Sequence, residues 1–121
     1  MTDFGSVYSL FKERYGDVAS ENDVKAFCFT AMREVDTLLK DGVDSRDPRV
    51  LGACAALANY RLRLRAFYTD DEVSSFRAGD VTVSYTPEAL AEAAKAEYKE
   101  AFGSITPLMK DTDFSFRTVR I

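Results

Sequence analysis

The chain has 121 residues, 46% of them hydrophobic, including nine Phe and six Tyr. This length and composition predict a single domain spanning residues 1–121 with a substantial hydrophobic core. Sixteen basic and 20 acidic residues give a formal net charge of −4, which argues against a strongly basic nucleic-acid-binding protein. The sequence contains no histidine, so Ser-His-Asp and Cys-His nucleophilic sites and histidine-containing zinc sites are excluded.

The composition also bears on where the protein resides. No apolar run approaches the roughly 20 residues that a transmembrane helix needs, and residues 1–5 lack the basic and apolar regions of a signal peptide. These features predict a protein that stays in the cytoplasm where it is made. Cys28 and Cys54 lie among Ala and Phe on the apolar sides of helical patterns, which predicts buried, reduced thiols.

Two helices are predicted in the first third of the chain. Residues 2–15 carry apolar side chains at helical spacing, with Thr2 or Asp3 as the N-cap and Gly16 at the end. A second helix begins after Ser20, a capping residue followed by acidic side chains, and its apolar face extends through residue 40. We expect Gly42 to end this helix in a left-handed conformation.

A third helix is predicted over residues 48–68, with Asp47 as its cap and Pro48 at its first position. Residues 50–58 are small and apolar nearly all round, a composition that suits a helix packed on several sides. We therefore predict that this helix is the centre of the fold.

The last third of the chain combines a helix with two short alternating segments. Residues 70–80 indicate a loop, and residues 81–85 alternate as in a β-strand. Thr86 caps a fourth helix predicted to reach about residue 109, with Pro107 kinking or tightening its last turn. Residues 113–121 alternate again and indicate a second short strand. The predicted fold is mainly α, a small domain of about four helices with one or two short β-strands.

The densest positive charge in the sequence comes from Arg61, Arg63 and Arg65. These side chains could contact phosphate. Three acidic residues follow at positions 70–72, however, and would neutralise a positive patch. We therefore favour solvated or ion-paired arginines at a helix end or subunit boundary.

Aromatic and β-branched side chains near the two predicted strands are the best candidates for protein–protein contacts. A chain end with exposed aromatic residues normally frays unless packing holds it. It can fold back on its own subunit, or it can add to a strand edge of a neighbouring copy, and both arrangements remain open. The candidate interface residues are Phe76, Arg77, Val81, Val83, Tyr85, Phe114, Phe116 and Arg117.

The sequence offers no constellation that predicts catalysis. Its acidic clusters are explained by helix capping and lack the ligand spacing of an EF-hand, and its glycines form no phosphate-binding loop. We expect a protein that is not an enzyme and that has no cofactor, metal or small-molecule substrate. A histidine-free enzyme that uses carboxylates is the weakest alternative.

Residues 70–121 resemble the small helical head–tail connector, or head-completion, family of tailed phages and prophages. The resemblance rests on residues 73–84 (VSSFRAGDVTVS), on the Ala-rich helix ending at residues 108–111 (LMKD), and on residues 114–117 (FSFR). The helices predicted over residues 24–40 and 48–68 are compatible with it in order and length.

The resemblance implies a structural subunit that assembles into a homo-oligomeric ring and joins the portal to tail-completion proteins. It also implies a channel through which DNA passes without specific binding, and a location in the host cytoplasm during assembly and at the head–tail junction of the virion afterwards. The alternative from a different class is a small cytoplasmic helical adaptor or regulator that binds one protein partner.

Overall fold

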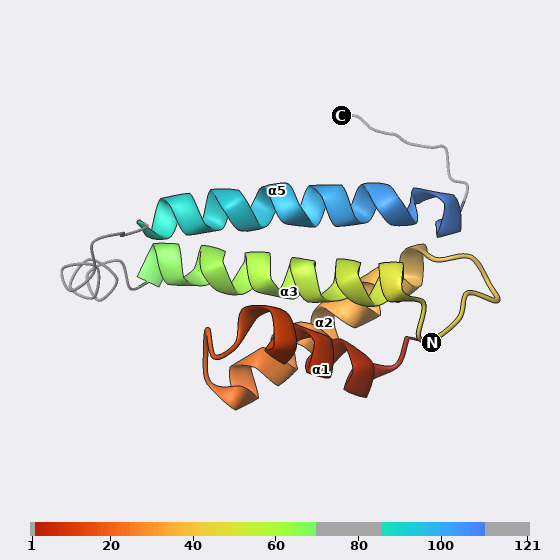
Figure 1. The fold of residues 1–121 in the computed structure, drawn as a ribbon, viewed down its shortest axis with the longest axis horizontal. Helices are drawn as coiled ribbons and strands as arrows, with labels where there is room; N and C mark the ends of the chain where they lie inside the picture. The colour runs from red at the N-terminus through yellow and green to blue at the C-terminus, as the bar shows by residue number, and fades with distance from the viewer. Residues whose placement is uncertain (1, 70–85, 111–121) are drawn as a thin grey trace.

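The computed structural model describes residues 2–69 and 86–110, and this part of the chain is a helical bundle (Figure 1). Its elements are α1 (Phe4–Tyr15), α2 (Glu21–Leu38), α3 (Pro48–Thr69), α5 (Pro87–Ile105) and the 3₁₀ turn η1 (Thr106–Leu108). The predicted mainly α fold is confirmed. The two predicted strands, at residues 81–85 and 113–121, lie outside the described residues.

Helix α3 occupies the middle of the bundle. It packs against α1, α2 and α5, and Figure 1 shows α5 along one side of α3 with α1 and α2 along the other. Every residue from Gly52 to Asn59 is buried. The small side chains of this run allow neighbouring helices to approach α3 from several directions, as the sequence predicted.

The core forms where the apolar faces of α1, α2 and α5 meet this helix. Phe11 from α1, Met32 from α2 and Ile105 from α5 are among its largest fully buried side chains. Cys28 and Cys54 also belong to the core and are not joined by a disulfide. The prediction of buried, reduced thiols is therefore confirmed.

Short polar side chains start the helices as predicted. Asp3, rather than Thr2, caps α1, while Ser20 caps α2 and Thr86 caps α5. Each accepts a hydrogen bond from the backbone N–H three residues later, at distances of 3.0, 3.2 and 3.0 Å respectively. These bonds satisfy N–H groups that the first turn of a helix leaves unpaired.

The predicted end of α2 was wrong. The helix stops at Leu38 instead of residue 40, and Leu39 is already extended. Gly42 does have a positive φ, of 89°, but it lies in the turn that follows. At the end of α1, Gly16 has a φ of 69° and donates its N–H to Lys12 O over 3.0 Å.

Helix α2 ends early because the next residue pairs with Met109, the residue that directly follows η1. Leu39 and Met109 form an isolated antiparallel bridge, which we call the 39–109 bridge. Lys40 N donates to Leu108 O over 2.8 Å, and Lys110 N donates to Leu38 O over 2.7 Å. The predicted fourth helix likewise ends before residue 109, because η1 tightens its last turn at Pro107.

Candidate functional site

The structure describes three of the candidate residues predicted from the sequence, namely Arg61, Arg63 and Arg65. The eight candidate interface residues, at positions 76, 77, 81, 83, 85, 114, 116 and 117, lie outside the described residues. The other surface features below belong to residues 2–69 and 86–110.

Two of the three arginines form ion pairs between α3 and α2. Arg61 Nη2 lies 2.7 Å from Glu34 Oε1, and Arg65 Nη2 lies 3.0 Å from Asp23 Oδ2. The hydrogen bond from Arg61 lowers the pKa of Glu34, and the bond from Arg65 lowers the pKa of Asp23. The Arg65 guanidinium also lies 5.1 Å from the centroid of the Phe27 ring.

Arg63 points elsewhere, because two positions along a helix correspond to a rotation of roughly 200°. Its side chain is half-buried, and this burial lowers its pKa. The three arginines thus do not form one positive patch on α3. The sequence indicated ion-paired arginines, and the structure gives Arg61 and Arg65 acidic partners on α2; residues 70–72 lie outside the described residues.

A small pocket lies between α2 and α3, and we call it the Phe27 pocket. Phe27, Thr30 and Arg61 line a space of about 110 Å³ that is open on one side. Because Arg61 is held by Glu34, one edge of the pocket is fixed by an ion pair.

Tyr98 of α5 lies near the same ion pair. Burial raises the pKa of its hydroxyl, and the charges of Arg61 and Glu34 also act on that group. Its ring stacks on Tyr60, with centroids 5.7 Å apart, and meets Phe102 edge-on at 4.6 Å. This aromatic column secures α5 to α3 beside the pocket.

Another surface combines aromatic rings of α1 and α2, and we call it the Phe29 patch. It consists of Phe4, Tyr8 and Phe29 with the flanking cations Lys25 and Arg33. Phe29 is 44% exposed and meets Phe4 edge-on at 6.0 Å, while Phe4 stacks on Tyr8 at 6.2 Å. Lys25 Nζ lies 5.6 Å from the Tyr8 ring centroid, and the Arg33 guanidinium lies 5.7 Å from that of Phe29.

Sequence reasoning missed the Phe29 patch. Phe29 directly follows Cys28 and falls outside the apolar stripe of its helix, which is a signal of an exposed aromatic residue. Phe4 and Tyr8 are four positions apart and therefore share one side of α1. What the sequence did not show is that α1 and α2 bring these rings together.

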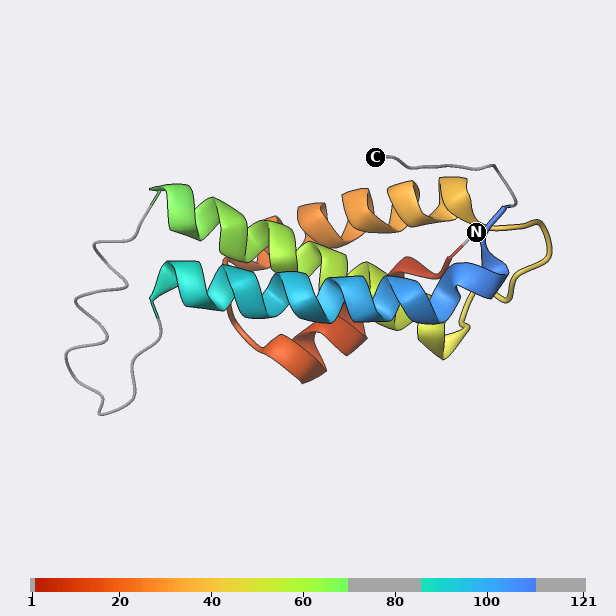
Figure 2. The same cartoon turned by 90° about the horizontal axis from the view of Figure 1, so that it is seen from above.

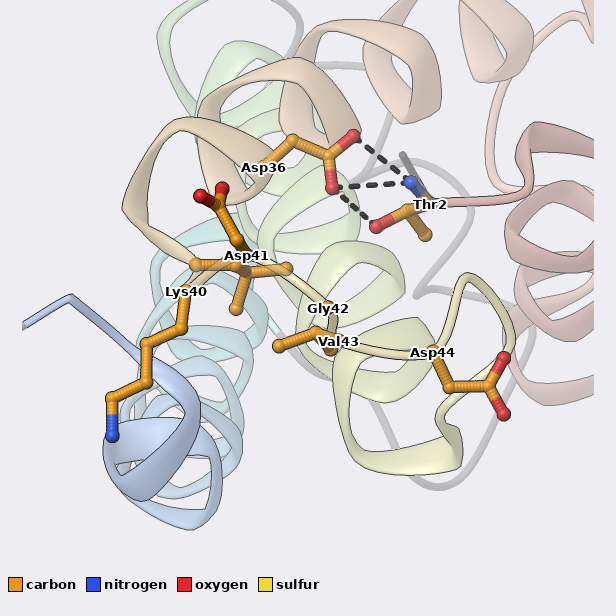
Figure 3. Close-up of a pocket in the computed structure, with 8 residues that line it drawn as sticks. Thr2, Asp36, Lys40, Asp41, Gly42, Val43 and Asp44 are labelled. Carbon is orange, nitrogen blue, oxygen red and sulfur yellow. Dashed lines mark hydrogen bonds between the residues drawn. The ribbon is translucent and has the colours of Figure 1, made fainter.

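A polar pocket of about 160 Å³ lies where α2 ends and the chain turns toward α3 (Figure 3). Thr2 N donates to both Asp36 carboxylate oxygens, at 3.2 and 3.1 Å, and the Thr2 hydroxyl also bonds Asp36. Asp41 and Asp44 are further acidic residues of its lining, but Figure 3 shows the Asp44 carboxylate pointing away from Asp36. The hydrogen bonds between Thr2 and Asp36 hold the first described residue of the chain against α2.

The described residues show neither a metal-binding cluster nor a membrane-spanning helix. Residues 2–69 and 86–110 contain no group of three or more Cys, Asp or Glu side chains arranged to hold a metal ion. Among the helices described, none has the length and apolar character needed to cross a membrane.

Comparisons with known proteins identify no relative of this chain. No family model, no curated protein and no solved structure matches it.

Proposed function

We propose that this protein is a structural subunit of tailed-phage or prophage morphogenesis, a head–tail connector that forms a ring between portal and tail. A sequence resemblance and a surface of the bundle support this proposal. Residues 70–121 resemble that family in sequence pattern. The bundle also has an exposed aromatic surface of the kind that protein–protein contacts use.

The Phe29 patch is the observation on which the proposal mainly depends. Aromatic residues and arginine are enriched in protein interfaces, and aromatic anchors often supply much of the binding energy. Phe29 leaves 44% of its surface exposed while its ring contacts Phe4 and the Arg33 guanidinium. These contacts restrict the ring before any partner arrives, which reduces the entropy lost on binding.

The proposed assembly has defined partners and a defined place. The subunit contacts copies of itself, the portal and tail-completion proteins, and it has no catalytic function, cofactor or small-molecule substrate. DNA passes through the ring without specific binding, which the net charge of −4 supports because acidic surfaces repel phosphate. The protein acts in the host cytoplasm during assembly and then at the head–tail junction of the virion.

The test compares the same added charge on two helices. Phe29→Asp places a carboxylate in the Phe29 patch, and Ala96→Asp places one at an exposed position of α5, which lies on the other side of α3 from α2 (Figure 1). Light scattering after size-exclusion chromatography and electron microscopy measure ring formation, alone and with a tailed-phage portal protein. We expect Phe29→Asp to abolish assembly and Ala96→Asp to preserve it.

A chain that stays monomeric with the portal protein present, and that copurifies with one host protein instead, would contradict the connector proposal. That result would favour the alternative, a small cytoplasmic helical adaptor or regulator that binds one protein partner.

A further inference from the structure

The 39–109 bridge fixes the direction of the chain at Met109 and Lys110, the last residues before position 111. Lys110 N is bonded to Leu38 O at the end of α2. Because Leu39 and Met109 are antiparallel, the chain at Met109 runs opposite to its direction at Leu39. At Met109 and Lys110 the chain is therefore directed toward the N-terminal half of α2 (Figure 2, where the ends of α2 and η1 lie together).

The side of α2 that carries Leu38 also contains the Phe27 pocket. Phe27, Thr30 and Leu38 occur at spacings of three and eight residues, which place them on one side of the helix. Leu38 is 42% exposed, and Phe27 and Thr30 line the pocket together with Arg61. An apolar side chain entering from the Lys110 end would pass Leu38 and then the Glu34–Arg61 ion pair before it reached this pocket.

The length of the chain beyond Lys110 matches this distance. Thr30 lies eight positions before Leu38, about 12 Å at the helical rise of 1.5 Å per residue. Phe114 lies four positions and Phe116 six positions beyond Lys110, which corresponds to about 13 and 20 Å in an extended chain. An apolar cavity of about 150 Å³ can accept benzene. The pocket, at about 110 Å³ and open on one side, can thus receive much of a phenyl ring.

We propose that residues 111–121 dock on α2 of their own chain and place a phenylalanine ring, from Phe114 or Phe116, in the Phe27 pocket. Residue alternation in an extended segment puts both rings on the side opposite Ser115, so one edge of the segment is aromatic. The short connection to Lys110 gives the segment an effective concentration near the pocket in the millimolar range. A modest apolar contact is therefore sufficient to populate the docked state.

This docking concerns the single subunit and does not depend on the connector proposal. It decides between the two arrangements that the sequence left open for residues 111–121, and it favours the subunit's own surface. A neighbouring copy could receive the segment only after it leaves the Phe27 pocket.

Cross-linking of the full chain tests the docking. Thr30→Cys and Ser115→Cys are combined in one variant, and a short bismaleimide joins thiols that lie close together. The control variant combines Ser115→Cys with Ser9→Cys, an exposed position on α1. Burial of Cys28 and Cys54 keeps the native thiols from reacting.

We expect the Thr30 variant to form an intramolecular cross-link roughly tenfold faster than the Ser9 control, at a rate independent of protein concentration. Adding Phe114→Ala and Phe116→Ala should reduce that rate to the control level. Equal rates for the two cysteine pairs, or covalent dimers as the main product, would overturn the proposal. Dimers would show that the segment docks on a second copy. The connector proposal is decided separately by ring formation with the portal protein.

Discussion

Shortening Leu57 to alanine tests the central position of α3. Leu57 is 4% exposed and belongs to the core. Replacing a buried Leu with Ala loses its apolar contacts and leaves a cavity, at a cost of about 2–5 kcal/mol. A domain of this size has a total stability of about 6–18 kcal/mol, at 0.05–0.15 kcal/mol per residue. Leu57→Ala should therefore remain folded but unfold at lower urea concentration, whereas Leu57→Asp should not fold because it buries an unpaired charge.

Urea unfolding followed by circular dichroism measures this loss directly. Tyr68→Ala is the matched control, because Tyr68 lies on the same helix and is 75% exposed. We expect the control to change the free energy of unfolding by no more than about 0.5 kcal/mol. A loss below about 1 kcal/mol for Leu57→Ala, or a natively folded Leu57→Asp, would show that this side of α3 is not part of the core.

Other side chains give predictions of different kinds. Thiol reagents at pH 8 should leave Cys28 and Cys54 unmodified until urea unfolds the chain, because both are buried in the core. Burial raises the pKa of both thiols to about 12, above the ordinary value of about 8.5, so the unfolded chain loses these protons first. The free energy of unfolding, from urea titrations at several pH values, should hence fall as the pH rises from about 9 toward 12. Asn59→Leu should raise the free energy of unfolding, measured by urea titration, by about 1 kcal/mol. The reason is that Asn59 is buried and its Oδ1 has no hydrogen-bond partner among the described residues. A destabilised variant would reveal a partner. Glu34→Gln should cost less than about 1 kcal/mol, and less still in high salt, because its ion pair with Arg61 is partly exposed.

Features of the fold that depend on nearby residues could be predicted from the sequence. Ser20 and Thr86 cap helices because their side chains bond a backbone N–H only three residues away. The central position of α3 followed from its composition, since a run that is apolar on all sides needs neighbours on all sides. These signals are local and do not depend on the rest of the chain.

Features that depend on distant residues could not be predicted in this way. Helix α2 ends early because Leu39 pairs with Met109, and no pattern near residue 40 contains that information. Arg61 was correctly weighed as an ion-pair candidate, but its partner, Glu34, lies on another helix. The Phe29 patch was missed because it forms only when α1 lies against α2.

The 39–109 bridge also determines how a mechanical load on the chain beyond Lys110 is distributed. A pull applied there is transmitted through Lys110 N to Leu38 O, and so it acts on α2 as well as on η1. Asp36, two residues earlier in α2, is bonded to Thr2, so the load is shared with the first residues of the chain. A subunit held under tension at this segment would therefore resist as a whole bundle, instead of losing α5 one turn at a time.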